Sequence, residues 1–492
     1  MGYQPGVMMA DLAIPTVAAF VPNDFKIDIC DEHISKINFE IDSKFIGITG
    51  RVYQKNRMIE IAKEFKKRGK IIIMGGSYVT LSPNVMREYC DILVQGEIEE
   101  IHTELFNDLR NNTYKDTYYG TKADLSLTPT PRWDLYPNNH ASAGSIQTSR
   151  GCPYQCEFCD VIVYLGRKQR HKPIDDVIKE LEVLYSLGYR SIVFSDDNFT
   201  VNRPHAKKLL KRLRDWNLKH KKSPVRFCTQ VSTDIVKDDE LLQLCAQAGF
   251  DQVFIGIESP NSDSMNEVKK FHNMKLEMAN VIKKFYNYGI LPYCGMILGF
   301  DSDYKNIFKQ QFELAMESFS PYFMINVLIA PDQTPLFNRL KKENRILTNK
   351  FVEVGSPLNS NIIFKNFSTD EMNLGMKWLA TNLYEPKNFT LRVLNMLDNF
   401  NTYKQPKSAS QLYEINGDHI LKDISKIISK IRNLGEEEKK MWNIIGEKII
   451  DKNVPKELFI TLMFFYMQLR HVYNENGIWQ PELIGVNLDF EK

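Results

Sequence analysis

The fold is decided by one stretch of the sequence, Ser149-Arg150-Gly151-Cys152-Pro153-Tyr154-Gln155-Cys156-Glu157-Phe158-Cys159-Asp160. Its three cysteines, Cys152, Cys156 and Cys159, follow the spacing C-x3-C-x2-C. An apolar segment that predicts a strand, Ser145–Thr148, comes directly before it. Three thiols on a short loop at the end of a strand predict an iron–sulfur site.

The number of thiols indicates the chemistry of this loop. Three thiolates are one fewer than the four irons of a cubane cluster require, so one iron stays open. We predict that Cys152, Cys156 and Cys159 hold a [4Fe–4S] cluster whose open iron binds the amino and carboxylate groups of S-adenosyl-L-methionine (SAM). An electron delivered there cleaves the sulfonium to a 5′-deoxyadenosyl radical, which side chains alone cannot achieve. A structural zinc site needs four ligands, and no fourth Cys or His stands nearby in a zinc-like spacing.

Strands and helices alternate around the cysteine loop, over residues 144–345. The predicted strands are Ser145–Thr148, Ser191–Ser195, Arg226–Val231, Gln252–Ile257, Tyr293–Leu298 and Met324–Ile329. The predicted helices are Ile174–Leu187, Arg203–Trp216, Asp239–Ala248, Leu276–Tyr288 and Tyr304–Phe319. Six strand–helix units predict a partial (β/α)6 barrel, in which the working residues lie where the strands end.

A second α/β pattern occupies residues 1–120 and predicts a Rossmann-like domain with a parallel sheet covered on both faces. Its predicted strands are Lys26–Cys30, Phe45–Thr49, Ile71–Gly75 and Ile92–Gly96. Its predicted helices are Ala10–Phe20, Lys55–Arg68, Asn84–Tyr89 and Glu99–Leu109. The overall fold class is therefore α/β.

The remaining segments predict a linker and a helical region. Residues 121–143 are rich in Pro and polar residues, which predicts a linker between the two α/β domains. Residues 346–492 predict a mainly helical C-terminal region. Its predicted helices are Asp370–Leu383, Asp423–Leu434 and Lys439–Ile449.

Composition restricts the function classes. A net charge of +2 gives no strong nucleic-acid signal, and 43% hydrophobic with 25% charged residues is typical of a globular protein. The longest apolar run, Leu458–Met467, is shorter than the roughly 20 residues of a transmembrane helix. Eight cysteines without a secretory signal favour the reducing cytoplasm. We expect the cysteines outside the motif to lie in the core: Cys30, Cys90, Cys228, Cys245 and Cys294.

The cysteine spacing, with the aromatic Phe158 before the third Cys, resembles the radical SAM superfamily. In that family the SAM amino group is bound near the end of the second barrel strand, where this chain has Asp196, Asp197 and Asn198. Two adjacent carboxylates suit an ammonium partner. The alternative is that Asp197 or Asn198 caps the following helix.

The resemblance also implies SAM contacts at the fourth and fifth barrel strands. Glu258 stands at the end of the fourth strand, where it could accept hydrogen bonds from the ribose hydroxyls. Gly295 and Gly299 belong to the fifth strand, in a segment similar to the one that packs beside adenine. The alternative for each of these residues is a purely structural role.

An α/β domain ahead of such a barrel resembles the cobalamin-binding class of radical SAM enzymes. Gly75, Gly76 and Gly96 follow predicted strands, where small residues let the backbone approach a flat macrocycle. The segment Tyr164-Leu165-Gly166-Arg167 is most similar to the subgroup that includes hopanoid C-2 methylases. The resemblance implies that cobalamin binds at these glycines.

Two features depart from this class. The chain starts almost at the first predicted helix, so the usual opening strand is missing. The Asp-x-His-x-x-Gly motif that ligates cobalt from below is also absent, because Lys36 stands where Asp31-Glu32-His33 would need a following Gly. His33 is therefore interpreted as an exposed loop residue. Many members of the class lack this histidine, so cobalamin stays implied.

The leading functional hypothesis is a cobalamin-dependent radical SAM enzyme that methylates an unactivated carbon of a small-molecule, lipid or peptide substrate. An electron donor such as flavodoxin or ferredoxin would be its partner. The alternative is a cobalamin-free radical SAM cyclase, epimerase or rearrangement enzyme with a degenerate first domain. A tRNA methylthiotransferase is excluded, because only Cys30 and Cys90 precede the motif and that class carries three further cysteines there. A binding protein with a purely structural cluster would not cleave SAM.

Overall fold

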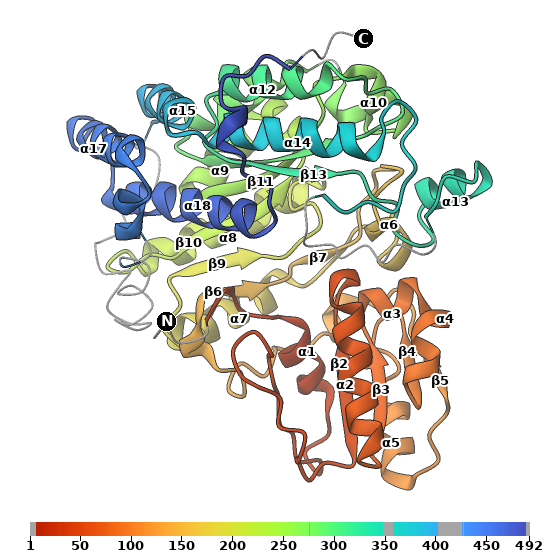
Figure 1. The fold of residues 1–492 in the computed structure, drawn as a ribbon. Helices are drawn as coiled ribbons and strands as arrows, with labels where there is room; N and C mark the ends of the chain where they lie inside the picture. The colour runs from red at the N-terminus through yellow and green to blue at the C-terminus, as the bar shows by residue number, and fades with distance from the viewer. Residues whose placement is uncertain (1–5, 275, 348–357, 402–425, 427, 489–492) are drawn as a thin grey trace. The chain divides into compact units, whose positions relative to one another are not determined.

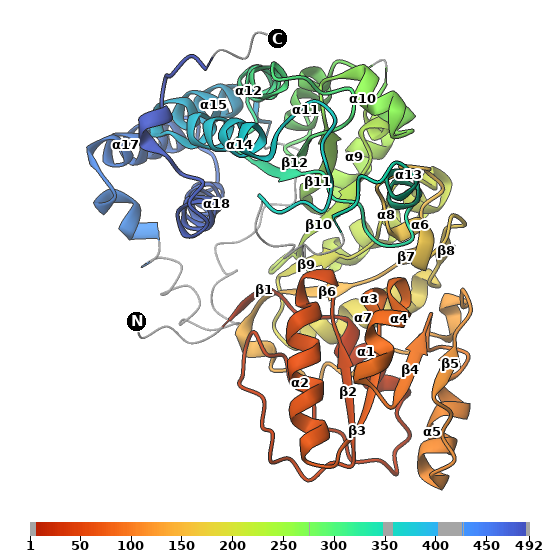
Figure 2. The same ribbon diagram turned by 45° about the vertical axis from the view of Figure 1, so that its right-hand side comes forward.

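The computed structural model describes residues 6–488 apart from residues 275, 348–357, 402–425 and 427. These residues form two compact units (Figures 1 and 2). The first unit runs to Phe199 and includes Ala330–Glu343. The second contains Thr200–Ile329, Asn344–Leu347 and the described residues after 357. The predicted domain boundaries, at residues 120, 143 and 345, stay predictions.

The first unit begins with short strands and amphipathic helices. Its elements up to residue 120 are β1 (Val7–Met9), α1 (Ala13–Phe20), β2 (Phe45–Thr49), α2 (Lys55–Lys67), β3 (Ile71–Gly75), α3 (Ser77–Leu81), α4 (Pro83–Met86), β4 (Ile92–Gln95), α5 (His102–Asn111) and β5 (Thr117–Tyr119). Its later elements are β6 (Ala141–Ile146), β7 (Ser149–Arg150), α6 (Val161–Tyr164), β8 (Arg170–His171), α7 (Ile174–Ser186), β9 (Ser191–Phe194) and α13 (Pro335–Lys342).

The N-terminal sheet is four-stranded, in the order β2-β3-β4-β5, and each neighbouring pair is parallel. One face packs on α2 and α3, where Met58, Phe65 and Val79 meet the strand side chains. The opposite face packs on α1 and α5 through Phe20 and Leu105. Figure 2 shows the strands between these helices. The strands are short apolar runs because both faces of the sheet are covered.

Strand β1 was absent from the sequence-based expectation, and it does not extend the N-terminal sheet. It pairs in parallel with β6, which pairs in parallel with β9. The predicted strand Lys26–Cys30 is wrong, because this segment has no ladder partner in the structure. Every second residue of this segment is partly buried, although the segment pairs with no strand among the described residues. Cys30 is consequently exposed rather than in the core.

The proline-rich segment predicted as a linker packs tightly within the first unit. Trp133 is fully buried, and the hydroxyl of Tyr136 donates to Asp31 at 2.8 Å. The same hydroxyl accepts from the backbone N–H of Asp11 at 3.1 Å. Residues of this segment therefore contact the N-terminal region through buried side chains, and its role as a linker stays a prediction.

The second unit carries four parallel strands in the order β10-β11-β12-β13, with helices between them. Its elements are α8 (Arg203–Lys219), β10 (Arg226–Val231), α9 (Asp239–Ala248), β11 (Phe250–Glu258), α10 (Ser262–Glu267), α11 (Met278–Tyr286), β12 (Leu291–Leu298), α12 (Ile307–Ser318), β13 (Phe323–Val327), α14 (Thr369–Tyr384), α15 (Pro386–Asn399), α17 (Glu436–Asp451) and α18 (Lys456–Glu475). The strands predicted from the sequence within residues 226–329 are all present.

The C-terminal helices of the second unit are coloured cyan to blue in Figure 1. Helix α18 contains the long apolar run, and its buried residues include Leu462, Met463 and Tyr466. Among the described residues, no helix is both long enough and apolar enough to cross a bilayer. Most of the predicted helix Asp423–Leu434 lies outside the described residues.

Candidate active site

The cysteine loop connects β7 to β8, which pair antiparallel and close its base. Gly151 opens the loop with a φ of +92°, and a Cβ there would lie 2.7 Å from the carbonyl oxygen of Lys168. The backbone N–H of Cys152 donates to Gly166 at 3.2 Å, and that of Cys159 donates to Cys156 at 3.1 Å. Glycine is therefore required where the chain turns tightly into the first thiol.

The three thiols lie close enough together to influence one another. Burial raises the pKa of Cys159, and the nearby Asp160 and the thiols of Cys156 and Cys152 raise it further. Within the described ranges, no three or more His, Cys, Asp or Glu side chains are gathered closely enough to hold a single metal ion. A cubane cluster does not require several side chains around one metal ion, because its thiolates bind different irons. The donor set thus fits the predicted cluster.

Asp196 fastens the strand end to the start of the cysteine loop. Its carboxylate accepts from the backbone N–H of Thr148 at 2.7 Å, from the Thr148 hydroxyl, and from the Ser149 hydroxyl at 2.7 Å. Its side chain is only 3% exposed, and burial raises its pKa. Both oxygens already have protein donors, so Asp196 braces the loop. Its predicted contact with the SAM ammonium group stays a prediction.

Asp197 holds the next turn of the same loop. Its Oδ2 accepts from the backbone N–H of Gly151 at 2.9 Å, beside Cys152. Burial raises its pKa to about 6, against the lowering effect of that hydrogen bond. The capping alternative is wrong for Asp197 and Asn198, because α8 begins at Arg203 and Asn202 caps it.

Asn198 is 4% exposed, and its Oδ1 has no hydrogen-bond partner in the described part of the chain. Its carbonyl oxygen accepts from the side-chain amide of Gln169 at 2.9 Å, and the same amide donates to Ser149 at 3.1 Å. The Oε1 of Gln169 also lacks a partner among the described residues. Two buried acceptors beside the cysteine loop are available to a ligand that carries hydrogen-bond donors.

A buried ion-pair network joins the loop after β4 to the residue that precedes Gly151. Arg150 pairs with Glu97 at 2.9 Å and with Glu99 at 2.7 Å. Arg170 pairs with Glu97 at 2.6 Å. Thr128 donates to Glu99 at 3.0 Å. The side chains of Glu97 and Glu99 are 7% and 1% exposed, so two guanidinium groups balance two buried carboxylates.

We call the loops after β3 and β4, Gly75–Thr80 and Gly96–Glu99, the sheet edge. Gly76 and Gly96 have φ values of +99° and +92°. A Cβ on Gly96 would strike the carbonyl of Gly120, and a Cβ on Gly76 would strike the Thr49 hydroxyl. The Thr80 hydroxyl donates to Gly76 at 2.8 Å and accepts from the N–H of Gly96 at 3.0 Å. The chain's own packing therefore explains both glycines, and their contact with cobalamin stays a prediction.

The predicted SAM contacts of the second unit meet at the ends of β11 and β12, Gly256–Ser259 and Gly295–Phe300, which we call the barrel rim. Glu258 is 7% exposed and pairs with Lys270. A Cβ on Gly295 would lie 3.6 Å from Oε2 of Glu258. Gly299 has a φ of +99°, and its N–H donates to Asp303 at 3.1 Å.

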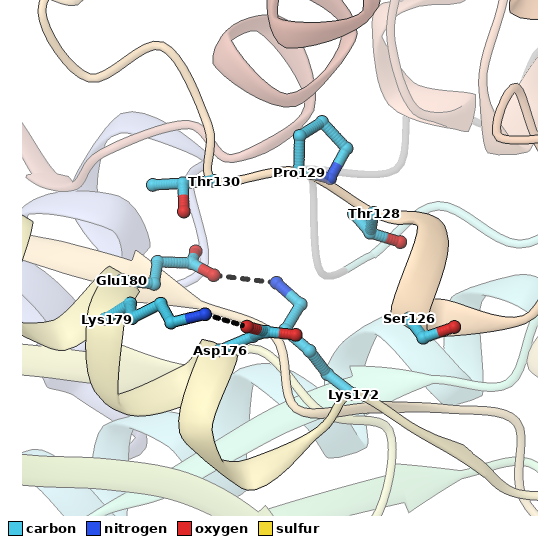
Figure 3. Close-up of a pocket in the computed structure, with 8 residues that line it drawn as sticks. All are labelled: Ser126, Thr128, Pro129, Thr130, Lys172, Asp176, Lys179 and Glu180. Atoms are coloured by element: carbon cyan, nitrogen blue, oxygen red, sulfur yellow. Dashed lines mark hydrogen bonds and ion pairs between the residues drawn. The ribbon is translucent and has the colours of Figure 1, made fainter.

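A polar pocket of about 220 Å³ lies between the segment Ser126–Thr130 and the start of α7 (Figure 3). Its charged residues pair among themselves, Lys172 with Glu180 and Lys179 with Asp176, each at 2.7 Å. None of the predicted site residues lines it. Since both cations are already neutralised, the pocket does not compete with the cysteine loop as the candidate site.

Sequence reasoning assigned no role to several of these residues. No role was predicted for Arg150 and Arg170 of the ion-pair network, or for Lys270 at the barrel rim. Arg150 stands directly before Gly151 and Cys152, and that position was the only sequence signal for it. The partners of Arg150 lie about fifty residues away in the sequence, so the pairing was not readable.

Comparison with known proteins agrees with this site. Residues 146–314 match the radical SAM superfamily, so this part of the chain is a radical SAM domain. Residues 334–477 match a domain of unknown function, DUF4070.

Two curated relatives carry methyltransferase names. The chain is 37% identical over 347 residues to an uncharacterized methyltransferase of Synechocystis sp., covering 69% of this chain and 64% of the relative. It is 30% identical over 341 residues to hopanoid C-2 methylase of Rhodopseudomonas palustris, covering 67% and 64%. The predicted resemblance to the subgroup with hopanoid C-2 methylases is confirmed. The chain spans slightly less than two thirds of the length of these relatives.

A solved structure shows the same fold. The cobalamin-dependent S-adenosylmethionine radical enzyme OxsB, with aqua-cobalamin and SAM bound, superposes with a TM-score of 0.61. The superposition covers 98% of this chain and 80% of OxsB, at 15% identity. The predicted fold class is confirmed: a Rossmann-like N-terminal sheet, a partial barrel of parallel strands and a helical C-terminal region.

Proposed function

We propose that this protein is a radical SAM enzyme that uses cobalamin to methylate an unactivated carbon. The cluster would be held by Cys152, Cys156 and Cys159. Bound there and at the sheet edge, the two cofactors would supply reductive SAM cleavage and a transferable methyl group. The methyltransferase names of the two relatives support the reaction class. The substrate would be a small molecule, lipid or peptide, and a flavodoxin or ferredoxin would supply electrons.

One observation carries the proposal: the sheet edge is directly bonded to the cysteine loop. Glu97 follows Gly96 in the sheet edge and pairs with Arg150, two residues before Cys152. A methyl donor and a radical source have to act on one substrate, so their sites have to be held together. Glu97 and Glu99 bring two buried carboxylates from the first domain to this position, which a degenerate domain would not need.

The residues around the cysteine loop would have separate roles. Asp196 and Asp197 hold the backbone that leads into Cys152, so the first thiol is fixed before a cluster binds. The unpartnered acceptor of Asn198 could receive a donor group of SAM. Phe158, half-buried beside Cys159, would limit water near the loop.

Replacing any one of Cys152, Cys156 and Cys159 by Ala should abolish both cluster binding and SAM cleavage, because each thiolate is the sole protein ligand of one iron. The measurement is iron content and 5′-deoxyadenosine formation after anaerobic reconstitution with dithionite as reductant. Cys245→Ala, at a buried helix position, is the matched control and should retain both. A fully active triad variant would contradict the cluster assignment.

Cobalamin binding decides between methylation and the cobalamin-free alternative. Titration of the reconstituted protein with hydroxocobalamin, followed by its visible spectrum, should show stoichiometric binding. Bulk at Gly76 would not isolate this effect, because its positive φ and the Thr49 contact would distort the turn itself. Absence of binding, together with SAM cleavage, would reject the methyltransferase proposal in favour of a cyclase, epimerase or rearrangement enzyme.

A further inference from the structure

The end of strand β11 departs from regular pairing. The register between β11 and β12 shifts between Gly256 and Glu258, as in a β-bulge. Glu258 itself has a φ of +61°, which is unusual for a residue with a side chain. Bulges re-aim side chains next to functional sites, and a strained backbone persists only where its surroundings hold it.

The carboxylate of Glu258 lies beside two glycines of neighbouring strands. Gly256 and Gly295 are register partners on β11 and β12. A Cβ on Gly256 would collide with Oε1 of Glu258 and would lie 2.7 Å from Nζ of Lys270. A Cβ on Gly295 would lie 3.6 Å from Oε2 of Glu258. The space at Gly256 is therefore given to this ion pair, whereas a Cβ on Gly295 would first meet the ring of Phe254 at 3.0 Å.

The ion pair is buried and fixed from several sides. The side chains of Glu258 and Lys270 are each 9% exposed. The backbone carbonyl of Glu258 accepts from the side chain of Gln311 at 2.8 Å. The N–H of Lys270 donates to Met265 at 2.9 Å, and Lys269 before it also has a positive φ, +57°.

The two carboxylate oxygens of Glu258 differ in their surroundings. Oε1 accepts from Lys270, whereas Oε2 receives no hydrogen bond from the described part of the chain. Glu258 therefore has one carboxylate oxygen available to accept a hydrogen bond from a ligand.

We propose that Lys270 is a positioning residue that pairs with Oε1 of Glu258 and keeps the carboxylate aimed, so that Oε2 accepts from the vicinal hydroxyls of a ribose in SAM. This rests on the proposed function, since SAM is the ligand. Lys270 acts through Glu258 and touches no reacting atom. Without Lys270, the carboxylate of Glu258 loses its charged partner and its fixed orientation.

The test measures SAM binding to reconstituted protein by equilibrium dialysis, and the SAM dependence of 5′-deoxyadenosine formation. Lys270→Met should raise the Kd and KM for SAM about tenfold or more, which is typical for loss of a charge-assisted hydrogen bond, and leave kcat within about twofold. Lys270→Arg should restore most of the affinity. Lys269→Met changes the exposed neighbour and should bind SAM as the wild type does.

Gly256→Ala is an independent variant that leaves the lysine in place. The atoms nearest to its Cβ would be the far ends of the Glu258 and Lys270 side chains, so it should displace the pair without unfolding the strand. It should weaken SAM binding to a similar extent. If Lys270→Met does not fold, this variant decides the matter.

Normal SAM affinity in a folded Lys270→Met or Gly256→Ala variant would overturn the role of Lys270. Loss of affinity in Lys270→Arg equal to that in Lys270→Met would also overturn it, because the charge would then be irrelevant. Failure of the proposed function looks different. In that case the wild-type protein forms no 5′-deoxyadenosine, and dialysis alone still compares the variants.

Discussion

The sheet edge and the barrel rim both end parallel strands with glycines, but these glycines face different neighbours. At the sheet edge, Gly96 is packed against the backbone of Gly120, and Gly76 against Thr49. At the barrel rim, Gly256 faces the charged ends of the Glu258 and Lys270 side chains. The first arrangement closes the chain on itself, whereas the second makes room for charged groups.

This difference shows how a glycine at a strand end should be interpreted. A glycine is found both where a ligand lies close to the backbone and where the chain packs closely on itself. The sequence therefore does not distinguish these two cases. Only the atoms that would meet a Cβ distinguish them. Where those atoms belong to the tight packing of a turn, as at Gly96 and Gly76, the glycine is structural, and where they are the ends of a charged pair, as at Gly256, the glycine makes room for that pair.

The largest effect within this comparison should come from the ion pairs that hold the sheet edge. Arg150→Met would leave Glu97 and Glu99 buried with fewer partners, and breaking a buried pair from one side costs about 3–5 kcal/mol. The measurement is the free energy of unfolding by urea. The control is Arg132→Met, whose exposed pair with Asp134 should contribute little to stability. Equal effects in the two variants would mean that the network does not hold the sheet edge.

A somewhat smaller effect should separate two glycines of the same edge. Gly96→Ala combines a positive φ with a backbone collision, so it should lower the free energy of unfolding by about 2–5 kcal/mol. Gly75→Ala meets only ordinary contacts, the nearest being Cβ of Val94 at 3.4 Å, and should change it by no more than about 0.5 kcal/mol. If Gly96→Ala were as stable as the wild type, the sheet-edge glycines would not be required by close packing, which would contradict the comparison.

The smallest effect should depend on pH and belongs to the barrel rim. Asp303 accepts from the N–H groups of Gly299 and Phe300 at 3.1 Å each, and burial raises its pKa to about 6. The folded protein then binds this proton more tightly than the unfolded chain, whose Asp pKa is near 3.8. Its contribution to stability is therefore complete below pH 3.8 and is lost as pH rises towards 6.

Asp303→Asn removes this titration. The difference in unfolding free energy between wild type and Asp303→Asn should shift by at most about 3 kcal/mol between pH 4 and 6, and be flat above that range. Denaturant unfolding at several pH values gives this difference. A constant difference across the range would show that folding does not raise the pKa of Asp303.

Much of the fold was predictable because its signals are local. Strands such as Phe45–Thr49 and Arg226–Val231 are short apolar runs between amphipathic helices, and they lie where the periodicity placed them. The segment Lys26–Cys30 has a similar alternation but no partner strand, so periodicity alone gave a wrong result. Strand β1 has three residues, too few for a periodic signal, and it is a strand because β6 lies beside it.

The candidate site divides in the same way. The sequence alone determined the cysteine loop, because three thiols within eight residues and the turn at Gly151 are held by neighbours in the chain. Only the tertiary structure decided that Asp196 braces this loop, that Arg150 pairs with Glu97 and that Lys270 pairs with Glu258. The spacing of side chains along the chain is visible in a sequence. The choice of partner for a buried charge is not, because it depends on which groups folding brings within a few ångströms once water is excluded.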